Sequence, residues 1–194
     1  MKKIKKFKVN IRKIEVIRNL KIILNLKELT QELEATIEKE IERSYSYIYP
    51  ESIFDTFQTS FLKEKFGLEF DPKQNIVAGS LFIVTIGEKI EDEIHAAKNK
   101  GENILSQIIH CIGLESCNSG INFVNRIIKE EAEKEDCEIT NIEKIYNKNI
   151  ELVKKIISNL SGEKINVTID NNSNIHPIYT TIGLIKWQPK RKRK

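Results

Sequence analysis

The longest uninterrupted apolar run in the chain is GSLFIVTIG at positions 79–87, and it has a glycine at each end. A run of this length is too short to cross a membrane as a helix, which takes about 20 residues. Its β-branched and aromatic residues favour an extended strand. Because such a strand has no polar side to turn toward water, the run predicts a strand buried on both faces of a sheet.

Segments with apolar residues three or four positions apart predict amphipathic helices. These segments are 12–22, 27–48, the stretch from 90 to the NKG at 99–101, a long segment of about 102–134, and NIELVKKIISNL at 149–160. In the first of them, Ile14, Ile17 and Leu20 are expected to form the buried face.

Alternation of apolar and polar residues predicts further strands. FKVNI (7–11) is expected to open the sheet, and the Phe-rich segment 52–71 is expected to form two strands joined by a turn at KFG. CEITNI (137–142) predicts a short strand. KINVTID (164–170) and IYTTIGLIKW (178–187) predict two closing strands, joined by the polar loop DNNSNIHP.

Length and composition favour one domain, at residues 1–188, because 194 residues suffice for a single well-buried core. Much of the net charge of +4 lies at the ends, so 189–194 is expected to be a basic disordered tail. The sequence lacks a secretory signal, an apolar span and paired cysteines, which favours a cytoplasmic protein. The thiols of Cys111, Cys117 and Cys137 are expected to be small buried side chains.

Four small residues, Gly113, Ser116, Cys117 and Gly120, share one side of the long helix at positions i, i+3, i+4 and i+7. Glycine inside a helix costs about 0.5–1 kcal/mol relative to alanine, so two of them indicate a steric need. Close packing against another backbone is the main interpretation. A ligand or partner seated along the stripe is the alternative.

Motifs of hydrolases, kinases and metalloenzymes are missing. His95, His110 and His176 have no Ser or Cys partner at motif spacing, and no metal site is expected. The segment ITNIEKIYNKN (139–149) connects a predicted strand to a predicted helix, a favoured place for a ligand. It contains no glycine, so from its residues alone it is a binding turn, an altered binding turn or only a connection.

The order of elements resembles the activation domain of cobalamin-dependent methionine synthase, in its free-standing bacterial form. FIVTIG (82–87) is similar to the strand and TIG turn of that family, and ILSQIIHCIGL (104–114) to its following helix with an Ile-Gly pair. The opening IEVIRNL and the closing NVTIDNNSNIHPIYTTIGLI also resemble the family. The resemblance therefore covers nearly the whole chain.

The resemblance implies a single α+β domain, with a twisted, mostly antiparallel sheet and flanking helices. It implies that S-adenosylmethionine binds in a shallow groove and supports reductive methylation, which reactivates cobalamin in methionine biosynthesis. The implied partners are cobalamin-dependent methionine synthase or another corrinoid protein, and a flavodoxin-like reductant. Cobalamin would enter only through the partner. The chain is then at most an accessory component of a methyltransferase that works in trans, without catalytic residues of its own.

The family holds its ligand with an RxxPGY motif after the strand that follows the long helix. Aligning that tyrosine with Tyr146 puts Asn141 at the arginine, Lys144 at the proline and Ile145 at the glycine. Asn141 supplies neither the positive charge nor the paired N–H donors of an arginine. The resemblance therefore implies that S-adenosylmethionine binds more weakly, by at least about one or two orders of magnitude. Lys144 is the candidate replacement cation, and Asp170 the stand-in for the family's acidic TES feature.

Two functions remain open at this point. One is a reactivation component with weakened or altered S-adenosylmethionine binding, and the other is a non-catalytic interaction module for a corrinoid protein that has lost the ligand. Nucleic acid binding through the basic ends is a third and minor hypothesis, because the body has no basic stripe with interleaved aromatic residues. No membrane partner is expected.

Overall fold

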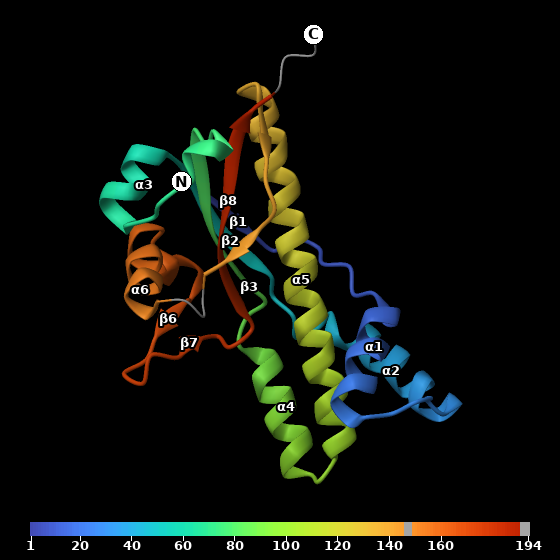
Figure 1. Cartoon of the computed structure of the whole chain (residues 1–194). Helices are drawn as coiled ribbons and strands as arrows, with labels where there is room; N and C mark the ends of the chain where they lie inside the picture. The colour runs from blue at the N-terminus through green and yellow to red at the C-terminus, as the bar shows by residue number, and fades with distance from the viewer. Residues whose placement is uncertain (146–148, 191–194) are drawn as a thin grey trace.

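The computed structural model describes residues 1–145 and 149–190. Its helices are α1 (Lys13–Leu24), α2 (Gln31–Ser44), α3 (Thr59–Phe66), α4 (Lys89–Asn99), α5 (Asn103–Lys134) and α6 (Ile150–Asn159), with 3-10 turns η1 (Pro72–Gln74) and η2 (Gly162–Ile165). Its strands are β1 (Lys2–Lys5), β2 (Glu51–Gln58), β3 (Ala78–Thr85), β4 (Cys137–Ile139), β5 (Glu143–Lys144), β6 (Thr168–Ile169), β7 (Ile175–His176) and β8 (Thr180–Pro189). The predicted α+β architecture is confirmed (Figure 1).

The main sheet is antiparallel, with the strand order β1-β2-β3-β8-β4 and with β5 also paired to β8. β3 occupies the centre, between β2 and β8. Its side chains alternate between two apolar layers, with Leu81 and Ile83 in one core and Phe82 and Val84 in the other. The prediction of a strand buried on both faces at 79–87 is therefore confirmed.

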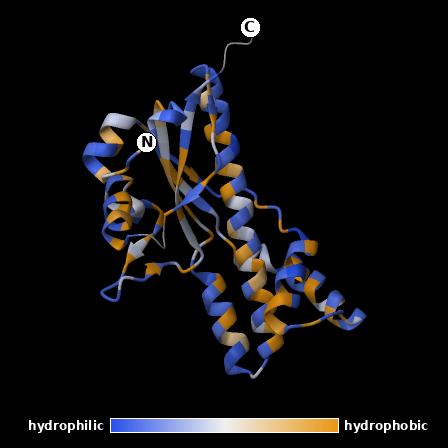
Figure 2. Ribbon diagram, viewed as in Figure 1, coloured by the Kyte–Doolittle hydropathy of each residue, from blue (hydrophilic) through white to orange (hydrophobic). Residues whose placement is uncertain are grey.

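Helices cover both faces of this sheet (Figure 1). The long helix α5 packs against β3 and β8 on one face, and α3 and α6 lie on the other. The half of α5 nearest its N-terminus extends past the sheet and packs with α1, α2 and α4. Apolar residues line the sides of the helices that face these layers (Figure 2).

The small-residue stripe of α5 packs against the sheet at Gly120 and against Tyr179 and helix α4 at Gly113. A Cβ atom on Gly120 would lie 2.8 Å from Cγ1 of Val84, and one on Gly113 would lie 2.5 Å from the ring of Tyr179. A side chain at either position would therefore force its neighbours to move. Close packing is confirmed at these two residues, but the neighbours are side chains and not the expected backbone.

The prediction of a strand at 7–11 is wrong. The segment is extended, and Phe7, Val9 and Ile11 are buried, but it pairs with no strand. The backbone N–H of Asn10 donates to Oγ of Ser119 on α5 at 2.8 Å. Residues 7–12 therefore form a strap along helix α5 and not a strand. The edge strand of the sheet is β1 instead.

The second strand expected within 52–71 is also wrong, because β2 is followed directly by helix α3. Leu62 and Phe66 are four residues apart and buried, which is helical spacing, and Gly67 ends the helix in the left-handed conformation. The expected buried face of α1 is wrong at Ile14, which is 72% exposed, because the helix turns Val16 and Leu20 into the core instead.

The expected closing hairpin is wrong as well. Only two residues of KINVTID form a strand, β6, and they pair with β7 in a separate two-stranded sheet. The segment before them turns as η2 and buries Ile165 and Val167 beneath the main sheet. β8 instead pairs with β3, β4 and β5, and so lies inside the sheet.

The sheet and its hydrogen bonds extend two residues past the expected domain limit at 188. Pro189 lies opposite Cys137 in the sheet, and the N–H of Lys190 donates to the carbonyl of Asp136 at 2.9 Å. Residues 191–194 of the expected tail lie outside the described residues.

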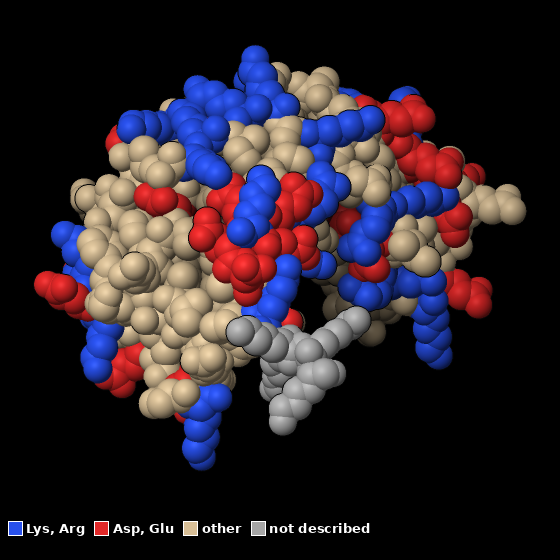
Figure 3. Space-filling view, turned by 90° about the horizontal axis from the view of Figure 1, so that it is seen from above, with Lys and Arg blue, Asp and Glu red and all other residues tan. Residues whose placement is uncertain are grey.

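The surface near this end carries both signs of charge. Viewed from that side, acidic side chains gather in the middle and Lys and Arg lie around them (Figure 3). The visible face is therefore not a continuous basic surface. Within the described ranges, no helix combines the length and apolar character needed to span a membrane.

Candidate functional site

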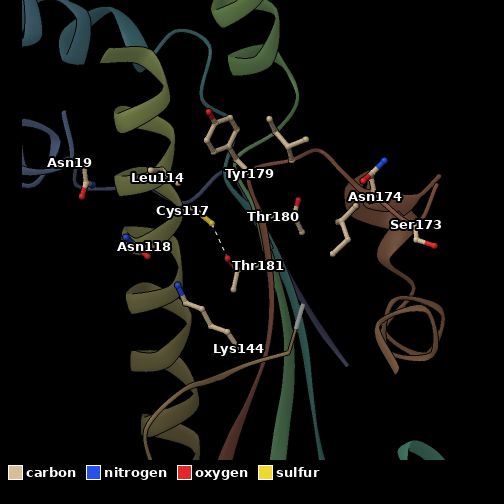
Figure 4. A pocket seen from close by; sticks show the side chains of 12 residues that line it. Asn19, Leu114, Cys117, Asn118, Lys144, Ser173, Asn174, Tyr179, Thr180 and Thr181 are labelled. Atoms are coloured by element: carbon tan, nitrogen blue, oxygen red, sulfur yellow. Dashed lines mark hydrogen bonds between the residues drawn. The ribbon is translucent and has the colours of Figure 1, made fainter. Parts of the chain in front are cut away.

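A groove with a volume of about 530 Å³ lies between α5 and the start of β8 (Figure 4). Residues from α1, α5, β5, the β6–β7 turn and β8 line it: Asn19, Leu114, Cys117, Asn118, Lys144, Ser173, Asn174, Ile175, Ile178, Tyr179, Thr180 and Thr181. The size is that of a small-molecule site, and its lining is mixed apolar and polar.

The floor of the groove is fixed where α5 meets β8. Sγ of Cys117 and Oγ1 of Thr181 lie 3.3 Å apart in a buried contact (Figure 4). Burial raises the pKa of the Cys117 thiol, although Thr181 and the charge of Lys144 act in the opposite direction. The thiol is therefore a neutral part of the floor and not a nucleophile. All three cysteines are free and buried, as the sequence predicts.

Lys144 supplies the positive charge of the groove. It lies on β5, opposite Gly183 of β8, and its side chain extends toward α5 near Asn118 (Figure 4). Within the described chain, no acidic side chain forms an ion pair with its ammonium group, whereas Lys186 on β8 pairs with Glu143 at 2.9 Å. An unpaired ammonium beside polar side chains favours an anionic ligand group.

Thr180 contributes a buried hydroxyl. The residue is 9% exposed, it lines the groove, and its Oγ1 has no hydrogen-bond partner among the described residues. Leaving a buried polar atom unpaired costs about 1–3 kcal/mol. A ligand or a water molecule in the groove is the natural partner of this atom.

Tyr179 separates the groove from a second cavity of about 250 Å³, lined mainly by α4 and α5. Its hydroxyl lies 2.6 Å from Nδ1 of His110 on α5. Burial raises the pKa of Tyr179, and burial together with the charge of Lys98 lowers the pKa of His110. The contact with His110 holds the ring of Tyr179 in place. Because both groups are kept neutral, the pair brings no charge to the groove.

The loop between β6 and β7 is organised by Asp170. Its carboxylate accepts hydrogen bonds from the backbone N–H groups of Asn172 and Asn174, both at 2.8 Å, and lies 3.2 Å from Nε2 of His176. These hydrogen bonds, chiefly those from Asn174, lower the pKa of Asp170 to about 2. The carboxylate therefore shapes the loop whose residues Ser173 and Asn174 line the groove.

The structure brings one of the residues chosen from the sequence into the groove. Lys144 lines it, Asp170 supports it through the loop, and Asn141 lines a different cavity of about 450 Å³ beside the C-terminal part of α5. Tyr146 lies outside the described residues, as does part of the segment 139–149.

Sequence reasoning missed the polar lining from β8, namely Thr180 and Thr181. Cys117 was recognisable as part of the small-residue stripe, and the stripe's alternative interpretation placed a ligand there. Nothing in the local sequence identifies Thr180 as a groove residue, because a strand has the same alternation of apolar and polar residues whether or not it contacts a ligand. Among residues 1–145 and 149–190, no three His, Cys, Asp or Glu side chains form a group that can hold a metal ion.

Comparison with known proteins gives a fold and no sequence family. No family model matches the chain, and no curated protein matches it. A solved structure described as "Crystal Structure of the MetH Reactivation Domain bound to AdoHcy" matches with a TM-score of 0.61 and 9% sequence identity. The match covers 100% of this chain and 80% of that chain. The resemblance to this domain is confirmed as a likeness of fold.

Proposed function

We propose that the chain is an accessory module of a corrinoid methyl-transfer system, and that its groove binds S-adenosylmethionine or the demethylated product. The observation that carries the proposal is the match over the whole chain to a MetH reactivation domain bound to AdoHcy. A groove of about 530 Å³ in the same chain supports it. In this role the module supports the reactivation of cobalamin-dependent methionine synthase or a related corrinoid protein, and a flavodoxin-like protein supplies the electrons.

The side chains of the groove fit the polar end of such a ligand. The ammonium of Lys144, which pairs with no acidic side chain of the described residues, suits a carboxylate. The hydroxyl of Thr180 offers a hydrogen bond that nothing in the described chain uses. Apolar contact is available from Leu114, Ile175 and Ile178. When bound, S-adenosylmethionine supplies an electrophilic methyl group.

The protein's own contribution is to bind and orient. Lys144 would hold the carboxylate and Thr181 would fix a polar group at the floor, while Thr180 would bond the ligand on the side of β8 that faces the β6–β7 turn. A lysine is a point charge without the planar fork of an arginine, so binding is expected to be weaker than in the family the sequence resembles. Tyr146 is retained in the proposed site because of that resemblance.

Calorimetric titration with S-adenosylmethionine and S-adenosylhomocysteine tests this proposal. The wild-type protein should bind at least one of them, and Lys144→Gln should weaken binding about 10- to 100-fold through loss of a charge-assisted hydrogen bond. Lys155→Gln is the matched control, since Lys155 is an exposed lysine on α6, across the sheet from the groove. No heat at millimolar ligand would remove the ligand-binding half of the proposal.

A second candidate is an interaction module that contacts a corrinoid protein without the ligand. The favouring observation is that none of the described lining residues is an arginine or a carboxylate, and that Asn141 lies at another cavity. Pull-down of purified methionine synthase lacking its own activation domain, with and without S-adenosylmethionine, separates the two. Capture that is independent of the ligand supports the interaction module, and dependent capture supports the first proposal.

A further inference from the structure

The strap formed by residues 7–12 presents every second side chain to a cavity that the proposed function does not use. Phe7, Val9 and Ile11 point into the core and are buried. The intervening residues Lys8, Asn10 and Arg12 line a cavity of about 320 Å³. The alternation that suggested a strand is therefore real, but its polar side faces a cavity and not a neighbouring strand.

The opposite wall of this cavity is a single stripe of α5. Glu115, Ser119, Asn122 and Arg126 follow one another at steps of four, three and four residues, so they share one face of the helix. This face differs from the one that carries Leu114, Cys117 and Asn118 at the groove. The cavity is thus a separate site on the same helix.

Two partly buried contacts join the two walls. The side chain of Glu115 is 2% exposed, and its carboxylate accepts from Nε of Arg12 at 2.6 Å and from Nη2 at 3.3 Å. The ring of Phe7 stacks on that of Phe123 with centroids 4.4 Å apart. These contacts hold the strap against this face of α5.

The charges that remain are positive. Arg12 pairs with Glu115 and lies 3.9 Å from Glu15, which also pairs with Arg18. Lys8 and Arg126 form no ion pair with any acidic residue of the described chain. Arg126 lies over the ring of Phe123, 5.5 Å from its centroid. Oγ of Ser119 accepts the N–H of Asn10, and its hydroxyl donates to no group among the described residues. Asn10 and Asn122 add amide donors.

We infer that this cavity binds a phosphate group, either free or as a monoester of a small molecule. Two unpaired cations on facing walls match a dianion, and a phosphate monoester carries about −1.5 to −2 charges at pH 7 with three acceptor oxygens. Guanidinium and ammonium groups with neutral donors between them are the usual ligands of phosphate. The partly exposed ring of Phe123 offers an apolar surface to the organic part of an ester.

The test is calorimetric titration of the whole chain with inorganic phosphate and with phenyl phosphate, at low ionic strength. Wild-type protein should bind at least one probe. Tighter binding of phenyl phosphate assigns the site to monoesters, and equal binding assigns it to free phosphate. Lys8→Gln and Arg126→Gln should each weaken binding about tenfold, as expected for loss of one charge-assisted contact. Both side chains are exposed, so the fold should persist in these variants.

Two controls keep the inference separate from the proposed function. Lys129→Gln, on the same helix but outside this cavity, and Lys144→Gln, in the groove, should bind the probes as the wild type does. Absence of binding at millimolar probe would overturn the inference, as would binding that Lys8→Gln and Arg126→Gln leave unchanged. Binding of a single-stranded oligonucleotide alone, with neither probe bound, would also overturn it, because the surface would then serve a polymer.

Discussion

Replacement of Gly113 by alanine tests whether the small-residue stripe exists for packing. An added Cβ would lie 2.5 and 2.8 Å from Cε1 and Cδ1 of Tyr179, and 2.9 Å from Cδ1 of Ile90. The end of Ile90 can rotate away, but the ring of Tyr179 is buried and fixed by His110. Overpacking of this kind costs about 1–3 kcal/mol, and the better helix propensity of alanine returns about 0.5–1 kcal/mol. We expect a net loss of about 0.5–2 kcal/mol in the free energy of unfolding.

The assay is urea denaturation of four proteins: wild type, Gly113→Ala, Tyr179→Ala and the double variant. In the Tyr179→Ala background the clash is gone, so Gly113→Ala should be neutral or should stabilise by up to about 1 kcal/mol. The destabilisation by Gly113→Ala should therefore disappear when the ring of Tyr179 is removed. If Gly113→Ala destabilises equally in both backgrounds, or stabilises the wild type, packing on Tyr179 is not the reason for this glycine.

Three further outcomes follow from buried polar groups. Ser80→Ala should lower the free energy of unfolding by about 1–3 kcal/mol, because Oγ of Ser80 accepts from the buried indole N–H of Trp187 at 2.9 Å. Fluorescence of this single tryptophan during urea denaturation measures the change. An unchanged denaturation midpoint would contradict the contact. Burial raises the pKa of Cys111 to about 11, and all three cysteines are buried. The thiols of the native protein should therefore react slowly with a disulfide reagent, and all three should react fast in urea. Rapid labelling of the native protein would refute burial of the thiols. The pKa of His110 is lowered in the folded state, so the unfolded state takes up a proton first as pH falls below about 6.5, and stability should decline there. The decline should be smaller in His110→Gln, and equal declines would exclude this histidine as the cause.

The sequence allowed the central strand and the long helix to be predicted because each carries a strong local signal. GSLFIVTIG is apolar throughout and is bounded by glycine, and it became β3, buried on both faces. The long helix was predicted at about 102–134 and observed at Asn103–Lys134, since its apolar positions keep helical spacing throughout. Signals of this kind depend on the segment alone.

The errors arose where the partner of a segment decides its structure. Alternation at 7–11 indicates an extended chain with one buried side, but it does not say whether a strand or a helix covers that side. KINVTID alternates in the same way and still forms only two residues of strand, because Ile165 and Val167 fill the second core from a turn. Period alone does not distinguish these cases.

The groove was less predictable than the fold because its residues come from distant parts of the chain. Lys144 and Thr181 lie on one side of β8 because β5 and β8 pair, and this pairing joins segments that a helix separates in sequence. The resemblance to activation domains pointed to the segment around 141–146, and of its described residues Lys144 lies in the groove. Thr180 becomes conspicuous only when its hydroxyl is seen to be buried without a partner in the described chain.

The most direct test of the central claim is a nuclear magnetic resonance titration of the 15N-labelled protein with S-adenosylhomocysteine. Binding in the groove predicts that the backbone amides of Cys117, Asn118, Thr180 and Thr181 shift in a saturable way. The amide resonance of Arg126, which lines the cavity beside the strap, should not shift. Shifts confined to residues outside the groove, or none at millimolar ligand, would contradict the assignment of this groove to S-adenosylmethionine.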